Sequence, residues 1–397
     1  MKLIRREYLD ILIEVMGTPD VKVITGIRRS GKSKLLEMFA KYIRENIRDH
    51  NIIEVNYNLL EFDGIREYRK LNEYVSERYV KDKANFVLID EIQMCKDFEK
   101  TINSLHAEGK YDIYITGSNA FLLSSDLATL FTGRAFEIEV YPFSFKEYIE
   151  YFEYDDIQNA FQKYVKEGGM AGSYLYDSTE KKYNYLNKLY NTLLIRDISQ
   201  RYNIRNEKLM DSLSDFFMDN ISNRTSLRNI SNALNIGDSN FETNHKTVGN
   251  YIKYLCDAFA FYKFSRYDIR GKKYLHSDEK YYLADHAFRY ARLGTKNMDY
   301  GKTYENIVAI ELLRRGYEVY TGTLYNKEID FVAQKRDEKI YIQVSDNIQD
   351  DDTLKRETDS LLKIRDAYPK IIIASTRHDN YQYEGIRIYD IANWLLG

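Results

Sequence analysis

Residues 21–36 read VKVITGIRRSGKSKLL, and this pattern guides the interpretation of the whole chain. The part from Gly26 to Ser33 matches G-x-x-x-x-G-K-[ST], the spacing of a phosphate-binding loop. The apolar run before it predicts a strand, and the apolar residues after it, up to Ile43, recur at helical spacing. The segment therefore predicts the strand, loop and helix that this motif requires.

Glycines in this loop allow successive backbone N–H groups to point at one spot, and the following helix adds its positive dipole end. Lys32 is expected to reach the β- and γ-phosphates, and the Ser33 hydroxyl is expected to ligate Mg²⁺. The alternative is an ordinary glycine-rich turn, but the pattern arises by chance in only about 1–2% of chains of this length. We therefore predict ATP and Mg²⁺ as cofactors. The predicted cofactor-binding residues are Gly26, Arg29, Ser30, Gly31, Lys32, Ser33 and Lys34.

A second segment, residues 85–91 (NFVLIDE), predicts a buried strand that ends in two carboxylates. In open α/β sheets, ligands bind at the carboxyl ends of the strands. We expect Asp90 to support the metal through water and Glu91 to act as the general base for the attacking water. Alone this pattern is weak, because turns after strands favour acids, but the phosphate loop upstream strengthens it.

Two further residues are candidates for sensing or stabilising the γ-phosphate. Asn119 follows the strand predicted at residues 111–116, with Ser118 as second choice; helix capping is the alternative role. Arg134, on a predicted turn, is a candidate arginine finger, either in cis or from a neighbouring subunit. A surface or ion-paired arginine is the alternative.

Length and composition predict a globular protein of about two to four domains, because the 397 residues are 44% hydrophobic and 30% charged. A net charge of -3 excludes a chain-wide cationic surface but allows a local basic patch. The two cysteines, Cys95 and Cys256, lie far apart, which indicates a reducing compartment and no zinc site. No apolar run approaches a membrane span and the first residues lack a secretory pattern, so we expect a soluble, cytoplasmic protein without a membrane partner.

Several segments together resemble prokaryotic AAA+-type P-loop ATPases fused to a C-terminal domain of unknown function. They are TGIRRSGKS, FVLIDEIQ, ITGSN and TGRAFEIEVYPFSFKEY, then GGMAGSYL, LLIRDISQRYNIRN, TVGNYIKYL and TYENIVAIELLRRG. The resemblance implies an α/β fold: an AAA+-type parallel sheet with a helical lid, then a winged helix and a small α/β restriction-endonuclease-like domain. The implied domains are residues 1–145 (P-loop ATPase), 146–215 (helical lid), 216–294 (winged helix) and 295–397 (PD-(D/E)xK-like).

The lid and the winged helix contribute further candidates. Arg196 and Arg201 are candidates for a lid arginine that touches nucleotide, with surface ion pairs as the alternative. A helix from His245 stands in the recognition position, and a hairpin is predicted around Gly271. Basic residues at these places suit duplex DNA, although the same hairpin suits protein docking. The candidate nucleic-acid contacts are Lys246, Thr247, Arg266, Arg270, Lys272 and Lys273.

The last domain contains an acid on a predicted helix, Glu305, and an acid placed at the end of a predicted strand, Asp330. This order resembles the PD-(D/E)xK nucleases, in which the next strand supplies an acid and a lysine. Gln343 and Ser345 stand at those two places, and neither supplies the required charge. We therefore predict a catalytically inactive nuclease fold in which both acids have structural roles.

The leading functional hypothesis is a Mg²⁺-dependent ATPase whose nucleotide state controls a winged-helix module that contacts DNA. One alternative is a nucleotide-controlled switch or scaffold that binds a protein partner. Another is an ATP-dependent nuclease. A homo-oligomer is also expected, because finger arginines of AAA+-type proteins often come from a neighbour.

Overall fold

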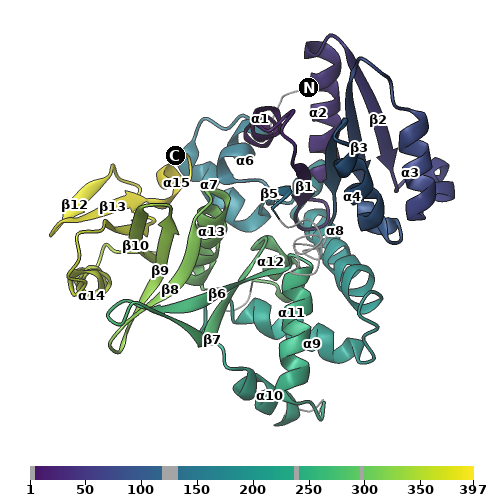
Figure 1. The fold of residues 1–397 in the computed structure, drawn as a ribbon. Helices are drawn as coiled ribbons and strands as arrows, with labels where there is room; N and C mark the ends of the chain where they lie inside the picture. Colours follow the sequence, from purple (N-terminus) through teal and green to yellow (C-terminus); the bar gives the residue numbers. More distant parts are fainter. Residues whose placement is uncertain (1–4, 119–132, 237–240, 296–298) are drawn as a thin grey trace. The chain divides into compact units, whose positions relative to one another are not determined.

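The computed structural model describes residues 5–118, 133–236, 241–295 and 299–397. These residues form two compact units (Figure 1). The first consists of residues 1–140 together with 257–259, and the second of residues 141–256 and 260–397. In the described part of the chain, no helix combines the length and apolar character needed to cross a membrane.

The first unit is built on a five-stranded sheet with the order β2-β3-β4-β1-β5. All neighbouring strands pair in parallel, as in the predicted parallel sheet, which is thereby confirmed. Every residue of β1 is buried, which suits a strand covered on both faces. The strands are β1 (Val21–Thr25), β2 (His50–Asn56), β3 (Ala84–Asp90), β4 (Tyr111–Thr116) and β5 (Ala135–Glu139).

Helices cover both faces of this sheet, because successive strand residues point to opposite sides. Apolar side chains of α1 (Arg6–Glu14) and α2 (Lys32–Asn46) pack on the face that carries Ile24 and Leu88. Those of α3 (Tyr68–Glu77) and α4 (Phe98–Glu108) pack on the face that carries Val23 and Ile89. The short 3₁₀ helices η1 (Leu60–Ile65) and η2 (Ile92–Met94) follow β2 and β3.

The strand order places β1 next to β4 and β4 next to β3. Because these strands are parallel, their carboxyl ends meet at one edge of the sheet. The loop that follows β1, the acids at the end of β3 and the residues that follow β4 therefore lie at the same edge, which is where such sheets bind ligands.

The second unit begins with helices whose starts are fixed by side-chain caps. Ser144 and Glu147 form a capping box at α6, and Asp156, Ser178 and Asn206 cap α7, α8 and α9. The helical elements are α6 (Phe145–Phe152), α7 (Ile157–Glu167), η4 (Ala171–Leu175), α8 (Thr179–Thr192), the π-helical η5 (Leu193–Ser199), α9 (Glu207–Asp219), α10 (Leu227–Ile236), α11 (His245–Asp257) and α12 (Ala287–Leu293).

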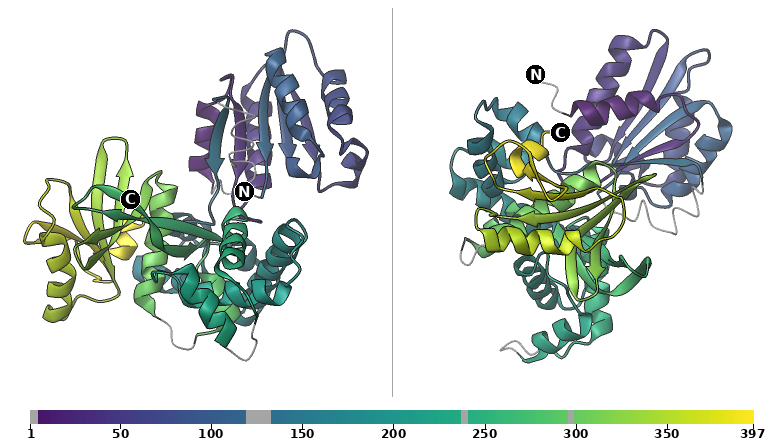
Figure 2. Two further views of the ribbon diagram at one scale, coloured as in Figure 1. Left: turned by 60° about the horizontal axis from the view of Figure 1, so that its bottom comes forward. Right: turned by 90° about the vertical axis from the view of Figure 1, so that its left-hand side faces the viewer.

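The strands of the second unit form one eight-stranded sheet with the order β12-β13-β11-β10-β9-β8-β6-β7, drawn from green to yellow in Figure 2. The predicted hairpin around Gly271 is its β6–β7 edge, and β6 also pairs in parallel with β8. The sheet thus continues across residue 294, where the sequence suggested a boundary. Its strands are β6 (Phe261–Asp268), β7 (Lys273–Leu283), β8 (Glu318–Leu324), β9 (Lys327–Lys335), β10 (Glu338–Ser345), β11 (Lys370–Ala374), β12 (Tyr381–Tyr383) and β13 (Ile386–Asp390).

Two helices cover opposite faces of this second sheet. Ile329 of β9 packs in the cluster that contains Leu361 of α14 (Asp351–Leu362). The next residue, Asp330, points to the other face, toward Glu305 of α13 (Tyr300–Arg314). The chain ends with the short helix α15 (Ile391–Trp394).

Gly26 provides a test of the backbone path that connects β1 to the loop. It has φ +133°, and a Cβ added to it would lie 2.2 Å from the carbonyl oxygen of Val140. Gly26→Ala should therefore lower the free energy of unfolding by about 3 kcal/mol or more, measured by urea denaturation. Gly109→Ala is the matched control, because Gly109 also has positive φ (+64°) but no heavy atom within 4 Å, and it should lose only about 1 kcal/mol. Equal losses would contradict the close approach.

Candidate nucleotide-binding site

The loop after β1 curls because several of its residues adopt positive φ. Gly26 has φ +133° and Gly31 has φ +104°, while Arg29, a non-glycine residue, has φ +63°. Gly31 is also the residue from which α2 starts. The backbone thus enters the helix through the conformations that phosphate-binding loops use to direct N–H groups to one spot.

Lys32 lies over this loop with its side chain buried. Its Nζ donates to the carbonyl oxygens of Gly26 and Ile27 at 2.8 and 2.9 Å, which holds the ammonium at the loop. The Ser30 hydroxyl is also buried and has no hydrogen-bond partner among the described residues. A buried ammonium, an unsatisfied hydroxyl and a helix N-terminus at one loop fit a phosphate group.

Ser33 and Asp90 line one crevice between the first turn of α2 and the end of β3, together with Asn56. The Asp90 carboxylate is buried and accepts hydrogen bonds from Thr116 Oγ1 at 2.6 Å and from Asn58 Nδ2 at 3.3 Å. A hydroxyl and a carboxylate are the hard oxygen donors that Mg²⁺ prefers, so the residues present fit this metal.

Glu91 has a left-handed backbone (φ +58°), an uncommon conformation for a non-glycine residue and one often found at functional sites. Its N–H donates to Thr116 Oγ1 at 3.0 Å, so one hydroxyl contacts both the Asp90 carboxylate and the Glu91 backbone. Its carboxylate Oε2 accepts from Ser118 Oγ at 3.3 Å and from Gln93 Nε2. Asn119, the first candidate sensor, lies outside the described residues, whereas Ser118, the second candidate, touches Glu91.

Sequence reasoning missed Thr116, Asn58 and Gln93 as members of this site. Thr116 ends β4 beside β3, and Asn58 follows β2 on the other side of β3. A signal for them existed, since polar residues at the ends of parallel strands gather at one edge of the sheet. The strand order that makes β2 and β4 the neighbours of β3 was not readable from the sequence.

The structure argues against Arg134 as an arginine finger in cis. Its carbonyl oxygen accepts from Val21 N at 2.8 Å, so it lies at the amino end of β1, opposite the phosphate loop. The five residues of β1 separate the two by roughly 13 Å, further than an arginine side chain extends. A finger role in trans stays a prediction. Of the lid candidates, Arg201 lies with its guanidinium 6.0 Å from the Tyr202 ring centroid, and the side chain of Arg196 lies outside the described part.

The remaining predicted loop residues lie at the surface. Arg29 and Lys34 are exposed, and Lys34 Nζ contacts Glu37 Oε2 at 2.5 Å. An exposed ion pair of this kind leaves Lys34 with little energetic role in the fold.

The candidate nucleic-acid residues are divided between α11 and the β6–β7 turn. Lys246 is exposed, but the Thr247 hydroxyl donates to Asn244, the residue that caps α11. Arg266 is not at the hairpin tip as predicted; it lies within β6, and its guanidinium donates to Thr323 Oγ1 of β8. The candidates that are exposed at the turn itself are Arg270, Lys272 and Lys273.

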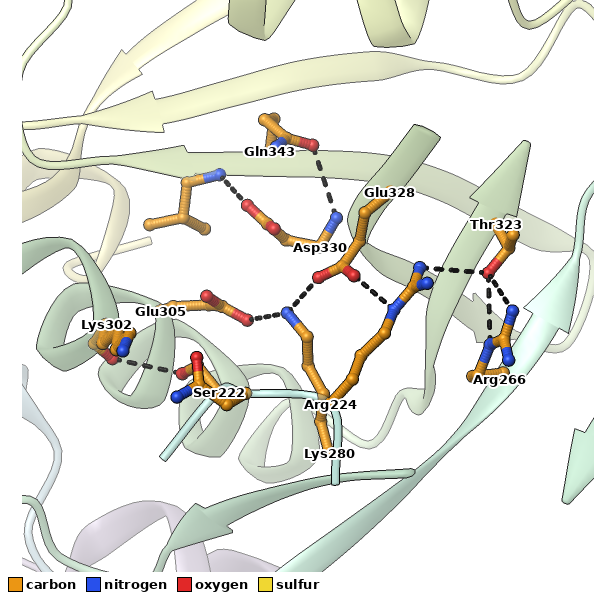
Figure 3. A network of polar contacts seen from close by, with 12 residues as sticks. Ser222, Arg224, Arg266, Lys280, Lys302, Glu305, Thr323, Glu328, Asp330 and Gln343 are labelled. Atoms are coloured by element: carbon orange, nitrogen blue, oxygen red, sulfur yellow. Dashed lines mark hydrogen bonds and ion pairs between the residues drawn. The ribbon is translucent and has the colours of Figure 1, made fainter. Parts of the chain in front are cut away.

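The two acids of the C-terminal sheet belong to a buried polar network (Figure 3). Lys280 of β7 is 3% exposed, and its Nζ lies 2.8 Å from Glu305 Oε1 and 2.5 Å from Glu328 Oε1. Tyr282 OH donates to the same Glu305 oxygen at 2.7 Å, and Arg224 pairs with Glu328 from the other side. Although burial opposes the charged amine, the neighbouring carboxylates raise the pKa of Lys280.

Asp330 lies within β9 rather than at its end, and its Oδ2 accepts from Val344 N at 2.8 Å. Gln343 faces it, with Oε1 accepting from Asp330 N at 3.3 Å. The cation that pairs with Glu305 is Lys280, on a strand that the sequence placed in another domain. Within the described ranges, no group of three or more His, Cys, Asp or Glu side chains is arranged to hold a metal ion.

The network predicts a pH-dependent stability. Burial raises the pKa of Asp330 well above its usual value; the Glu305 carboxylate adds to this and Lys280 opposes it. The folded protein then binds more protons than the unfolded chain, so the free energy of unfolding falls as pH rises above about 4 toward the folded pKa. Asp330→Asn removes the carboxyl group and with it this pH-dependent contribution to the free energy of unfolding. Between pH 5 and 7.5 the wild type should lose stability relative to Asp330→Asn, measured by thermal unfolding.

Asp359→Asn is the control for this measurement. Hydrogen bonds from Lys327 and Lys363 lower the pKa of Asp359 to about 2, so it is ionised in both states over that range. The difference between wild type and Asp359→Asn should therefore not change between pH 5 and 7.5. An Asp330→Asn protein that loses stability relative to wild type as pH rises would contradict the raised pKa.

Comparison with known proteins finds a family match for most of the first unit and a relative that covers nearly the whole chain. Residues 18–149 match a family described as AAA domain, and residues 158–299 match a domain of unknown function (DUF8612). A solved structure of the Aeropyrum pernix ORC1 protein in complex with DNA is 13% identical, with a TM-score of 0.32, and the match covers 78% of this chain and 94% of that one.

Two relatives, neither of them characterized, match over most of this chain. Protein MJ1544 of Methanocaldococcus jannaschii is 28% identical over 81% of this chain and 74% of its own length. A protein of Haemophilus influenzae is 37% identical over 99% of this chain and 98% of its own length. The chain therefore belongs to the same family as the uncharacterized Haemophilus influenzae protein, and its N-terminal part is an AAA domain.

Proposed function

We propose that this protein binds ATP with Mg²⁺ and hydrolyses it to ADP and phosphate. The observation that carries the proposal is the convergence of Lys32, Ser33, Asp90 and Glu91 at the carboxyl edge of one parallel sheet. An AAA domain matched over the same residues supports a nucleotide-binding and hydrolysing role.

Each of these residues has a role that follows from its side-chain chemistry. Backbone N–H groups of the loop and the Lys32 ammonium hold the phosphates and neutralise charge that develops on the γ-phosphoryl oxygens. Ser33 and Asp90 would hold Mg²⁺, which supplies further positive charge at the β- and γ-phosphates. Glu91 accepts a proton from the attacking water, and Ser118 and Gln93 orient its carboxylate.

Lys32→Ala tests the assignment. Removing an ammonium that contacts the phosphates should lower kcat for ATP by at least about 100-fold and weaken ATP binding. Phosphate release and the binding of a fluorescent ATP analogue measure the two effects. Lys41→Ala, on the exposed side of α2 where Lys41 pairs with Glu45 at 3.6 Å, is the control and should behave as wild type. Unchanged turnover in Lys32→Ala would rule out this site.

We further propose that residues 146–215 act as a lid, and that the nucleotide state controls DNA contact by residues 216–294. The support is the basic turn between β6 and β7, where Arg270, Lys272 and Lys273 are all exposed. Exposed cations on a short turn can follow a phosphate backbone without displacing buried partners. Protein docking by the same turn is the competing function, and DNA titration separates the two.

The DNA proposal predicts a salt-dependent affinity. The affinity for a DNA duplex, measured by filter binding over a salt series, should fall steeply as the salt concentration rises. Lys272→Ala with Lys273→Ala should reduce the slope of log K against log[salt] by about 2, since each lost phosphate contact contributes about 0.9. The control pair, Lys355→Ala on α14 with Lys363→Ala at the C-cap of that helix, removes the same charge elsewhere and should leave the slope unchanged. Equal slopes for all three proteins would favour a protein partner.

A further inference from the structure

A second buried cation contacts the phosphate loop from a helix that precedes the first strand. We infer that Arg5 is a positioning residue of the nucleotide site: its guanidinium fixes the Ser30–Gly31 peptide for phosphate binding and adds positive charge to the loop. This inference rests on the proposed binding of ATP. It assigns a role to α1, which the phosphate-binding motif itself does not include.

The contact is short and enclosed. Arg5 is only 5% exposed, and its Nη2 donates to the carbonyl oxygen of Ser30 at 2.5 Å. Nε and Nη2 lie 3.6 and 3.7 Å from the point that a Cβ on Gly31 would occupy. The guanidinium is thus packed against the last turn of the loop, at the residue from which α2 starts.

Helix α1 holds this guanidinium in place. Arg5 is the residue immediately before α1, whose Leu9 and Leu12 pack in the same apolar cluster as Phe39 of α2. The ring of Tyr8 lies 5.3 Å from the guanidinium carbon, a cation–π contact. Arg5 therefore reaches the loop from a rigid element that packs on the helix it acts upon.

The hydrogen bond orients a phosphate-binding amide through the planarity of the peptide group. The carbonyl of Ser30 and the N–H of Gly31 belong to one trans peptide, so they point in opposite directions. When Arg5 fixes the carbonyl oxygen on its own side, the Gly31 N–H must point away from Arg5. That N–H begins the helix whose N-terminus binds phosphate, so its direction is set before the ligand arrives.

The charge of Arg5 also acts on the ligand. Lys32 and the positive dipole end of α2 lie at the same loop, so Arg5 adds its charge to a region that already attracts anions. The next residue, Arg6, provides the contrast, because its side chain is 77% exposed and lies 3.7 Å from Asp10 on the surface of α1.

ATP turnover by full-length Arg5→Gln, Arg5→Lys and Arg6→Gln tests the inference. Arg5→Gln should raise KM for ATP about tenfold, the loss expected for one charge-assisted hydrogen bond, while kcat at saturation stays within about twofold. Arg5→Lys keeps a cation and a donor, so its KM should lie within about threefold of wild type. Arg6→Gln should match wild type in both constants.

The ATP-induced rise in Tm, measured on the same samples, separates positioning from folding. It should shrink in Arg5→Gln and persist in Arg6→Gln, whatever the Tm of each protein without nucleotide. Equal KM values in Arg5→Gln and Arg6→Gln, or a KM in Arg5→Lys as high as in Arg5→Gln, would overturn the role of Arg5. A wild-type protein without ATP binding or turnover would instead overturn the proposed function, and the inference with it.

Discussion

Parallel pairing of β1 with β4, and of β4 with β3, is the constraint on which the nucleotide site depends. It brings a loop near residue 30 and two acids near residue 90 to one sheet edge, although about 60 residues separate them in the chain. The hydroxyl of Thr116, at the end of the strand between them, then ties the edge together, because it contacts both Asp90 and the Glu91 backbone. Oxygen and nitrogen groups at this edge are ordered by bonds within the sheet before any ligand binds.

The predictable parts of the site are those that one continuous segment defines. The loop glycines, Lys32 and Ser33 belong to a single strand–loop–helix segment, so spacing alone predicted their shared role. The acids at the end of β3 were predictable for the same reason, since a run of four apolar residues that leads into two carboxylates indicates a covered parallel strand. Local patterning likewise predicted the strands β1, β3 and β4 of the first sheet and the β6–β7 hairpin.

Contacts between distant segments account for what the sequence did not predict. Thr116 and Asn58 join Asp90 only because β4 and β2 flank β3, and strand order is a property of the assembled sheet. Lys280 meets Glu305 because β6 pairs with β8, which joins the hairpin to the C-terminal sheet. A sequence divided into domains at residue 294 separates that lysine from its partners. Arg134 is the opposite case. It follows the site residue Ser118 by only a short stretch of sequence, but it lies at the end of β1 away from the phosphate loop.

We propose that the β1 loop and the acids at the end of β3 enclose one triphosphate. A crystal structure with Mg²⁺ and a non-hydrolysable ATP analogue tests it most directly. We expect Lys32 Nζ to leave the Gly26 and Ile27 carbonyl oxygens for the phosphates, with Ser33 and Asp90 beside the metal and Glu91 facing the γ-phosphate. An analogue bound elsewhere, or a Lys32 that keeps its carbonyl partners beside a bound nucleotide, would contradict the account.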